Sequence, residues 1–187
     1  MKTRTHNLRF NVSTPSNVVS LARDLAFQAH GEIDHFRRFT DEPYIVHPEA
    51  VALRVREDGG SLEAVAAAWL HDTVEDTNLS IESIEKVCGS RVAEIVWFLT
   101  DHALAAAGNR ATRQQINNQH LARGGYDVHL IKRADILDNL KSLVVYDPNF
   151  ARVWIEEKLI QSASLTSLSP KDLGVLIGLL SFHRRFL

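Results

Sequence analysis

The chain has 187 residues, of which 21 are Lys or Arg and 23 are Asp or Glu, so its formal net charge is −2 with the nine His neutral. Hydrophobic residues make up 45% of the chain, which provides enough apolar surface for a buried core and excludes disorder as the main state. The near-neutral charge argues against wholesale binding to nucleic acids or anionic membranes.

Start and stop signals divide the chain into helices. Thr14-Pro15 opens the first helix and Gly31 ends it, while Gly59-Gly60 and Gly124-Gly125 end later helices. The sequence lacks the period-two alternation of strands, so the predicted fold class is all-α. The helices are expected at residues 14–31, 48–56, 61–71, 80–89, 90–99, 110–123, 128–144, 148–165 and from 169 onward.

The segment HDTVED, which begins at His71, concentrates polar groups at the end of a predicted helix. Glu75 follows His71 by four residues, and Asp76 follows Asp72 by four, so helical spacing places each pair on one face. The segment therefore offers an imidazole, three carboxylates and a hydroxyl to a single ion. On its own, however, it favours a solvated acidic turn with a capping histidine.

Two further segments change this interpretation. PYIVHP places His47 directly before a helix, and KRAD places Asp135 inside an otherwise apolar helix. A lone His is usually a satisfied hydrogen-bonding group, and a lone Asp on a helix usually lies at the surface. Taken together with His71 and Asp72, however, these residues form an H…HD…D pattern.

This pattern resembles the metal site of the HD-domain phosphohydrolases. Three stretches, PYIVHPEAV, AAAWLHDTVEDT and IKRADILDNLKSL, are similar to the hydrolase domain of the RelA/SpoT family, especially its small alarmone hydrolases. The resemblance covers residues 21–143 and implies an HD-domain helical bundle that removes the 3′-pyrophosphate of the alarmone ppGpp.

The resemblance also implies that His47, His71, Asp72 and Asp135 bind Mn²⁺. Two imidazoles and two carboxylates suit a borderline-hard divalent ion, and spacing alone does not exclude Fe, Co, Ni or Zn. By the same resemblance, Glu75 and Asp76 accept a proton from the attacking water. The alternative for these two residues is an acidic patch at a helix N-terminus.

Three residues correspond to nucleotide contacts of the family. Asn139 matches the Asn of its AD-x-x-x-N stretch, and Ser142 stands where Thr is common. Arg38, in the irregular loop of residues 32–44, matches the Arg of an Arg-Lys pair that lines the base pocket. A guanidinium can stack on a purine and still donate hydrogen bonds.

The chain departs from the family at several positions. Phe39 replaces the Lys of the Arg-Lys pair, and Asp138 stands where the usual ADRLHN or ADKLYN has His or Tyr. Phe lacks a hydrogen-bond donor, so guanine, whose edge carries an oxygen acceptor, loses more binding affinity than adenine does. We therefore predict a weaker preference for guanine. His120 either approaches the polyphosphate or lies at the surface.

Two other functions remain open. The chain could be an HD phosphohydrolase of another nucleotide, such as a deoxynucleoside monophosphate, or a binding protein that senses an alarmone without cleaving it. Glu75 and Asp76 argue against the second alternative, because a sensor does not need a carboxylate that activates water.

The remaining features concern organisation and location. A single domain is expected over residues 1–187, and residues 148–187 either pack over the bundle or form a homodimer interface. The single cysteine, Cys88, excludes an intrachain disulfide, and the polar N-terminus lacks the apolar stretch of a signal peptide. We therefore expect a soluble cytoplasmic protein whose partner is a nucleotide, with no nucleic acid and no membrane.

Overall fold

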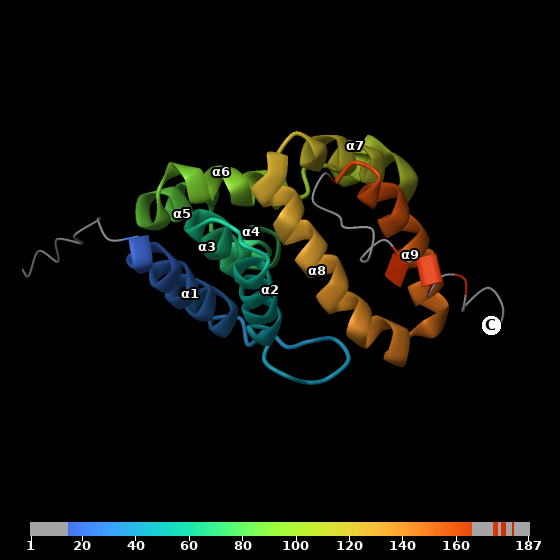
Figure 1. Cartoon of the computed structure of the whole chain (residues 1–187), viewed down its shortest axis with the longest axis horizontal. Helices are drawn as coiled ribbons and strands as arrows, with labels where there is room; N and C mark the ends of the chain where they lie inside the picture. Colours follow the sequence, from blue (N-terminus) through green and yellow to red (C-terminus); the bar gives the residue numbers. More distant parts are fainter. Residues whose placement is uncertain (1–14, 166–173, 176, 179–180, 182–187) are drawn as a thin grey trace, which may run out of the picture.

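The computed structural model describes residues 15–165, 174–175, 177–178 and 181, and over these residues the predicted all-α class is confirmed. Figure 1 shows the arrangement of the helices. The elements are α1 (Pro15–Gly31), α2 (Val46–Glu57), α3 (Leu62–Leu70), α4 (Thr73–Asp76), α5 (Ile81–Cys88), α6 (Ser90–Leu99), the 3₁₀ turn η1 (Ala105–Ala107), α7 (Arg110–Ala122), α8 (Gly125–Tyr146) and α9 (Pro148–Ser162).

Most helix boundaries agree with the predicted ones to within three residues. Ser61 and Ser80 cap α3 and α5, where each hydroxyl accepts a backbone N–H from the first turn. The one-turn helix α4 was not predicted, because its polar sequence has no apolar periodicity. Thr73 Oγ1 donates to the Leu70 carbonyl at 2.7 Å and stabilises this turn. Most of the helix expected from Ser169 lies outside the described residues, and the described positions 174–175, 177–178 and 181 are helical.

Helix α3 forms the centre of the core. Every residue from Ala64 to Leu70 is buried, and the helix contacts α1, α2, α6 and α8. Its run of alanines allows these neighbours to approach closely, because the small side chains leave room for the adjacent backbones. The end of α3, where the HDTVED segment begins, is therefore held rigidly inside the bundle.

The long helix α8 lies between two parts of the molecule. Helices α1–α6 lie on one side of it in Figure 1, and α7 and α9 lie on the other. Side chains along α8 can therefore face the buried end of α3 and also the space beside α9.

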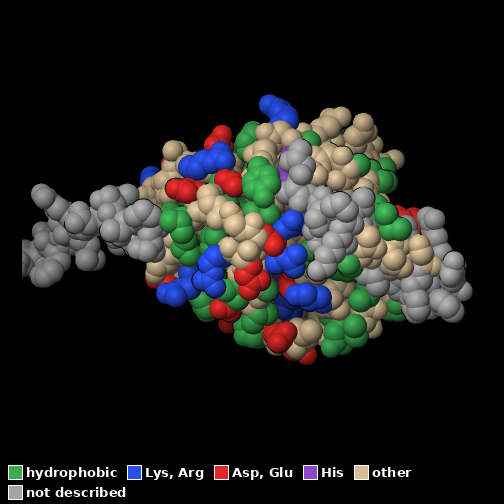
Figure 2. Space-filling view, in the orientation of Figure 1, with side chains coloured by type: hydrophobic (Ala, Val, Ile, Leu, Met, Phe, Trp, Pro, Cys, Tyr) green, Lys and Arg blue, Asp and Glu red, His purple; other side chains and the backbone are tan. Residues whose placement is uncertain are grey.

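The surface agrees with the small net charge. Basic and acidic side chains lie next to one another on the face shown in Figure 2. Among the described residues, none of the helices combines the length and apolar character needed to cross a membrane.

Candidate metal centre and active site

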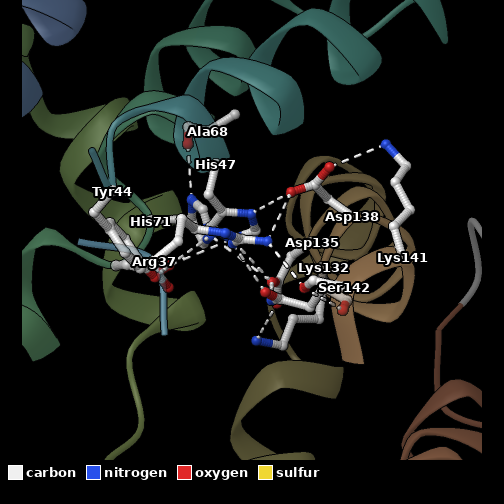
Figure 3. Close-up of polar contacts among 12 residues, drawn as sticks. Arg37, Tyr44, His47, Ala68, His71, Lys132, Asp135, Asp138, Lys141 and Ser142 are labelled. Carbon is white, nitrogen blue, oxygen red and sulfur yellow. Dashed lines mark hydrogen bonds and ion pairs between the residues drawn. The ribbon is translucent and has the colours of Figure 1, made fainter. Parts of the chain in front are cut away.

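Four side chains from three parts of the chain converge on one point. His47 lies in the first turn of α2, His71 and Asp72 connect α3 to α4, and Asp135 lies in the middle of α8. His47 Nε2 is 3.3 Å from Asp135 Oδ1 and 3.5 Å from Asp72 Oδ2, and His71 Nε2 is 3.1 Å from Asp72 Oδ2 (Figure 3). All four residues expected to bind a metal ion are thus brought together.

The two histidines present nitrogen atoms that fit a metal ion. His47 Nδ1 donates to Asp138 Oδ2 at 2.7 Å, and His71 Nδ1 donates to the Ala68 carbonyl at 2.8 Å. Within the described part of the chain, the two Nε2 atoms are buried and make no hydrogen bond. With Nδ1 as the donor on each ring, both Nε2 lone pairs can face the carboxylates. A divalent cation held by His47, His71 and Asp72, whose ligand atoms lie within 4.8 Å of one another, would satisfy both nitrogens, and Asp135 Oδ1 lies beside them, 3.3 Å from His47 Nε2.

Electrostatics keep this cluster ready for a cation. Burial raises the pKa of Asp72, but the adjacent His71 outweighs burial and holds the pKa well below its usual range. Burial likewise raises the pKa of Asp135, and the Lys132 ammonium outweighs it. Burial lowers the pKa of His47, yet the neighbouring carboxylates of Asp135 and Asp138 outweigh burial and raise the pKa to about 9. A metal ion that binds here must therefore displace a proton from the imidazole.

The two carboxylates are held by Lys132 and Tyr44, which the sequence did not single out, and by Asn139, which it assigned to the nucleotide. Lys132 Nζ lies 2.8 Å from Asp135 Oδ2, and Asn139 Nδ2 donates to Asp135 Oδ1 at 2.5 Å. Tyr44 donates its hydroxyl hydrogen to Asp72 Oδ2 at 2.5 Å. The spacing of Lys132 and Asn139, three residues before and four after Asp135, is the signal that could have identified this shared helix face.

Glu75 and Asp76 lie on α4, immediately after Asp72, and their side chains are largely exposed. Glu75 Oε1 accepts the Asp101 backbone N–H at 2.6 Å. Partial burial raises the pKa of Glu75 to about 7, although the Asp101 N–H acts in the opposite direction. Partial burial and the charge of Asp72 also raise the pKa of Asp76. Glu75 can therefore exchange a proton near neutral pH.

A cavity of about 210 Å³ lies beside the cluster, and Arg38, Asn139 and Ser142 all line it. The basic residue that contacts the other two is, however, Arg37. Its guanidinium donates to Asn139 Oδ1 at 3.2 Å and to Ser142 Oγ at 3.4 Å. Arg38 instead lies over the Phe39 ring, 5.1 Å from its centroid. The cavity thus contains a cation despite the absence of the expected Lys.

Aromatic rings form the other wall of this cavity. Phe39 lines it and stacks on Tyr146 with the two planes 4° apart and 5.9 Å between centroids. Phe150 and Trp154 line it from α9. Flat apolar walls beside hydrogen-bonding groups suit a nucleobase.

A second, more polar cavity of about 290 Å³ lies between α7, α8 and α9. Glu75, Lys132 and Lys158 line it, together with Arg110 and Arg113. Burial and, to a smaller extent, the nearby Lys132 charge lower the pKa of Lys158 to about 8. The second cavity therefore brings cationic side chains next to the carboxylates of the cluster.

His120 lies away from both cavities. Its Nε2 donates to the Trp97 carbonyl at 2.9 Å, and its ring packs edge-on against that indole. The surface alternative is thus the one that the geometry supports. Trp97 itself is 39% exposed, whereas Trp69 on α3 is buried.

The comparisons with known proteins agree with this geometry. The HD domain family matches residues 22–159. A guanosine-3′,5′-bis(diphosphate) 3′-pyrophosphohydrolase of Aquifex aeolicus is 36% identical over 68% of this chain and 18% of its own length. The MESH1 guanosine-3′,5′-bis(diphosphate) 3′-pyrophosphohydrolase of Danio rerio is 41% identical over 54% of this chain and 56% of its own. The chain thus spans less than two thirds of the length of both curated relatives.

A solved structure has a similar fold over nearly the whole chain. It is that of a metazoan ortholog of SpoT that hydrolyzes ppGpp, with a TM-score of 0.75 and 25% sequence identity. The alignment covers 94% of this chain and 99% of the solved one, so the two chains share the arrangement of the described helices.

Proposed function

This chain belongs to the HD-domain family, and on that basis we propose that it hydrolyses the 3′-pyrophosphate of a purine alarmone such as ppGpp or pppApp. Water adds to the phosphorus attached to O3′, the P–O3′ bond breaks, and O3′ takes up a proton. The products are pyrophosphate and the 5′-nucleotide. The observation that carries the proposal is the pair of buried imidazole Nε2 atoms that face Asp72 and Asp135 beside two cavities.

We propose Mn²⁺ as the ion that His47, His71, Asp72 and Asp135 hold. When bound, the ion would supply a Lewis acid that polarises a phosphoryl oxygen and makes water more acidic. The mixed set of imidazole nitrogens and carboxylate oxygens supports this assignment, because such ligands suit a borderline-hard divalent ion.

Glu75 and Asp76 are proposed to take the proton from the attacking water. They follow the ligand Asp72 within one helical turn. A general base works best when its pKa lies near the working pH, and the pKa of Glu75 is about 7. These carboxylates support a hydrolase over a protein that only senses the alarmone.

The 210 Å³ cavity is proposed to bind the nucleoside, with Arg38, Asn139 and Ser142 as contacts and Arg37 as a further one. Phe39 supports stacking on the base but supplies no donor, which favours reduced discrimination between guanine and adenine. The cations of the second cavity support an anionic substrate. We further propose that residues 1–187 form one domain, that the protein is cytoplasmic, and that the region from residue 148 onward either packs over the bundle or pairs two copies.

Product analysis tests this function. The purified protein is incubated with ppGpp, pppApp and deoxynucleoside monophosphates, with Mn²⁺ or with EDTA. We expect pyrophosphate and a 5′-nucleotide from an alarmone with Mn²⁺, and no product with EDTA. Release of phosphate from deoxynucleoside monophosphates alone would favour the other HD phosphohydrolase activity, and binding of alarmone without any product would favour a sensor.

A further inference from the structure

Asp138 contacts a residue of the metal centre from outside the cluster. It lies on α8, three residues after Asp135, and its Oδ2 accepts the Nδ1–H of His47 at 2.7 Å (Figure 3). The His47 side chain is fully buried, and that of Asp138 is 14% exposed. The hydrogen bond is therefore short, charge-assisted and shielded from water.

We propose that Asp138 is a positioning residue that orients His47 for metal binding; this inference rests on the proposed metal-dependent function. Because the carboxylate can only accept, it holds the hydrogen on Nδ1 and leaves the lone pair on Nε2. It also fixes the rotation of the ring, so that Nε2 points at Asp72 and Asp135. A carboxylate in this position also makes the imidazole a stronger ligand.

The two histidines of the cluster differ in this support. His71 Nδ1 donates to a backbone carbonyl, that of Ala68, within its own helical turn. His47 relies on a side chain 91 positions later in the sequence. The orientation of His47 therefore depends on the packing of α2 against α8, and one substitution can remove it.

Two cations lie next to the Asp138 carboxylate. Lys141 Nζ lies 3.0 Å from its Oδ1 on the solvent side, and Arg37 Nη2 lies 3.6 Å from its Oδ2 on the cavity side. Arg37 also lines the proposed nucleoside cavity. Asp138 thus lies between a metal ligand and a residue that can contact the nucleotide.

Metal affinity measured without substrate tests the role of Asp138. The metal-free protein is titrated with Mn²⁺, and the free ion is counted from its electron paramagnetic resonance signal. The variants are Asp138→Asn, Asp138→Ala and, as a matched control, Lys141→Gln. Circular dichroism checks that each variant is folded.

We expect Asp138→Ala to weaken Mn²⁺ binding by about 10- to 100-fold, as other outer contacts of metal-binding histidines do. Asp138→Asn should weaken it less than Asp138→Ala, because the amide oxygen still accepts from Nδ1. Lys141→Gln should bind Mn²⁺ within about twofold of the wild type, because this side chain is 75% exposed and its charge is screened by water.

Other outcomes would overturn the inference. Equal loss in Asp138→Asn and Asp138→Ala, with a matching gain in Lys141→Gln, would mean that net charge alone controls affinity. Unchanged affinity in Asp138→Ala would remove the positioning role while leaving the proposed function intact. A wild-type protein that binds no Mn²⁺ but hydrolyses an alarmone would contradict the proposed metal and this inference together.

Discussion

The Arg37 guanidinium donates to the side-chain oxygen of Asn139 across 102 residues of sequence. Asn139 in turn donates to Asp135, a proposed metal ligand. One chain of hydrogen bonds therefore joins the irregular loop before α2 to the metal centre on α8. A nucleotide that contacts Arg37 would lie within reach of both.

Arg37 should matter more for substrate than Arg38. Arg37→Met removes two donors from the cavity, and a hydrogen bond to a charged group is worth about 1.5–3 kcal/mol, so kcat/KM should fall about 10- to 100-fold. Arg38→Met should also lower kcat/KM, but by only about threefold, because the Arg38 guanidinium lies over the Phe39 ring and not on Asn139 or Ser142. Steady-state kinetics on ppGpp compare the two variants, and a larger loss in Arg38→Met would restore the assignment made from the sequence.

Removal of one ligand should empty the metal centre. His71→Ala and Asp135→Ala each delete a donor from a set of four, so we expect the purified variants to retain little metal. Elemental analysis after dialysis against a fixed Mn²⁺ concentration measures the occupancy. Full occupancy in both variants would show that the ion binds elsewhere.

Glu75→Gln should retain Mn²⁺ and substrate but lose turnover. The amide has nearly the shape of the acid but cannot accept a proton, and a positioned base contributes about 10²- to 10⁴-fold. The measurements are kcat and Mn²⁺ affinity on the same preparation. An unchanged kcat would assign the base to Asp76 or another group, and a loss of metal would make Glu75 a ligand.

The dependence of kcat on pH should show the ionisation of Glu75. Glu75 must be ionised to act as a base, so kcat should fall as the pH decreases below about 7. Besides burial, Asp101, Lys132 and Asp72 act on the pKa of Glu75.

The same pKa should affect the stability of the fold. Because the pKa of Glu75 in the folded state exceeds the ordinary value of 4.5, the folded state binds more protons than the unfolded state between pH 4.5 and about 7. The contribution of Glu75 to stability therefore decreases as the pH rises through this range. Thermal unfolding of Glu75→Gln should depend less on pH there, and equal slopes would contradict the raised pKa.

Phe39→Lys tests the choice of base. A lysine at this position adds a donor to the nucleoside cavity, so the ratio of kcat/KM for ppGpp over pppApp should rise by about 10-fold, the size of one polar contact. Arg37 already supplies a cation, and the double variant Arg37→Met, Phe39→Lys separates the two contributions. A wild-type protein that ignores pppApp, with a ratio unaltered in Phe39→Lys, would reject the reduced preference for guanine.

Local sequence was sufficient for the helices and for the choice of candidate ligands. Ser61, Ser80 and the paired glycines act through neighbouring residues, so start and stop signals predicted most helix boundaries. Short, distinctive sequence motifs identified the four candidate ligands, His47, His71, Asp72 and Asp135.

The contacts between distant segments were decided only by the tertiary structure. Arg37, and not Arg38, reaches Asn139. This could not be predicted, because residues 32–45 follow no periodic pattern from which a side-chain direction could be derived. The partnership of His47 with Asp138 depends on the packing of α2 against α8, which no local motif records. Sequence thus determined which chemical groups were available, whereas the packing of the helices determined which atoms face one another. A hydrogen bond tolerates a change of only a few tenths of an ångström in its donor–acceptor distance, and only the assembled bundle sets that distance.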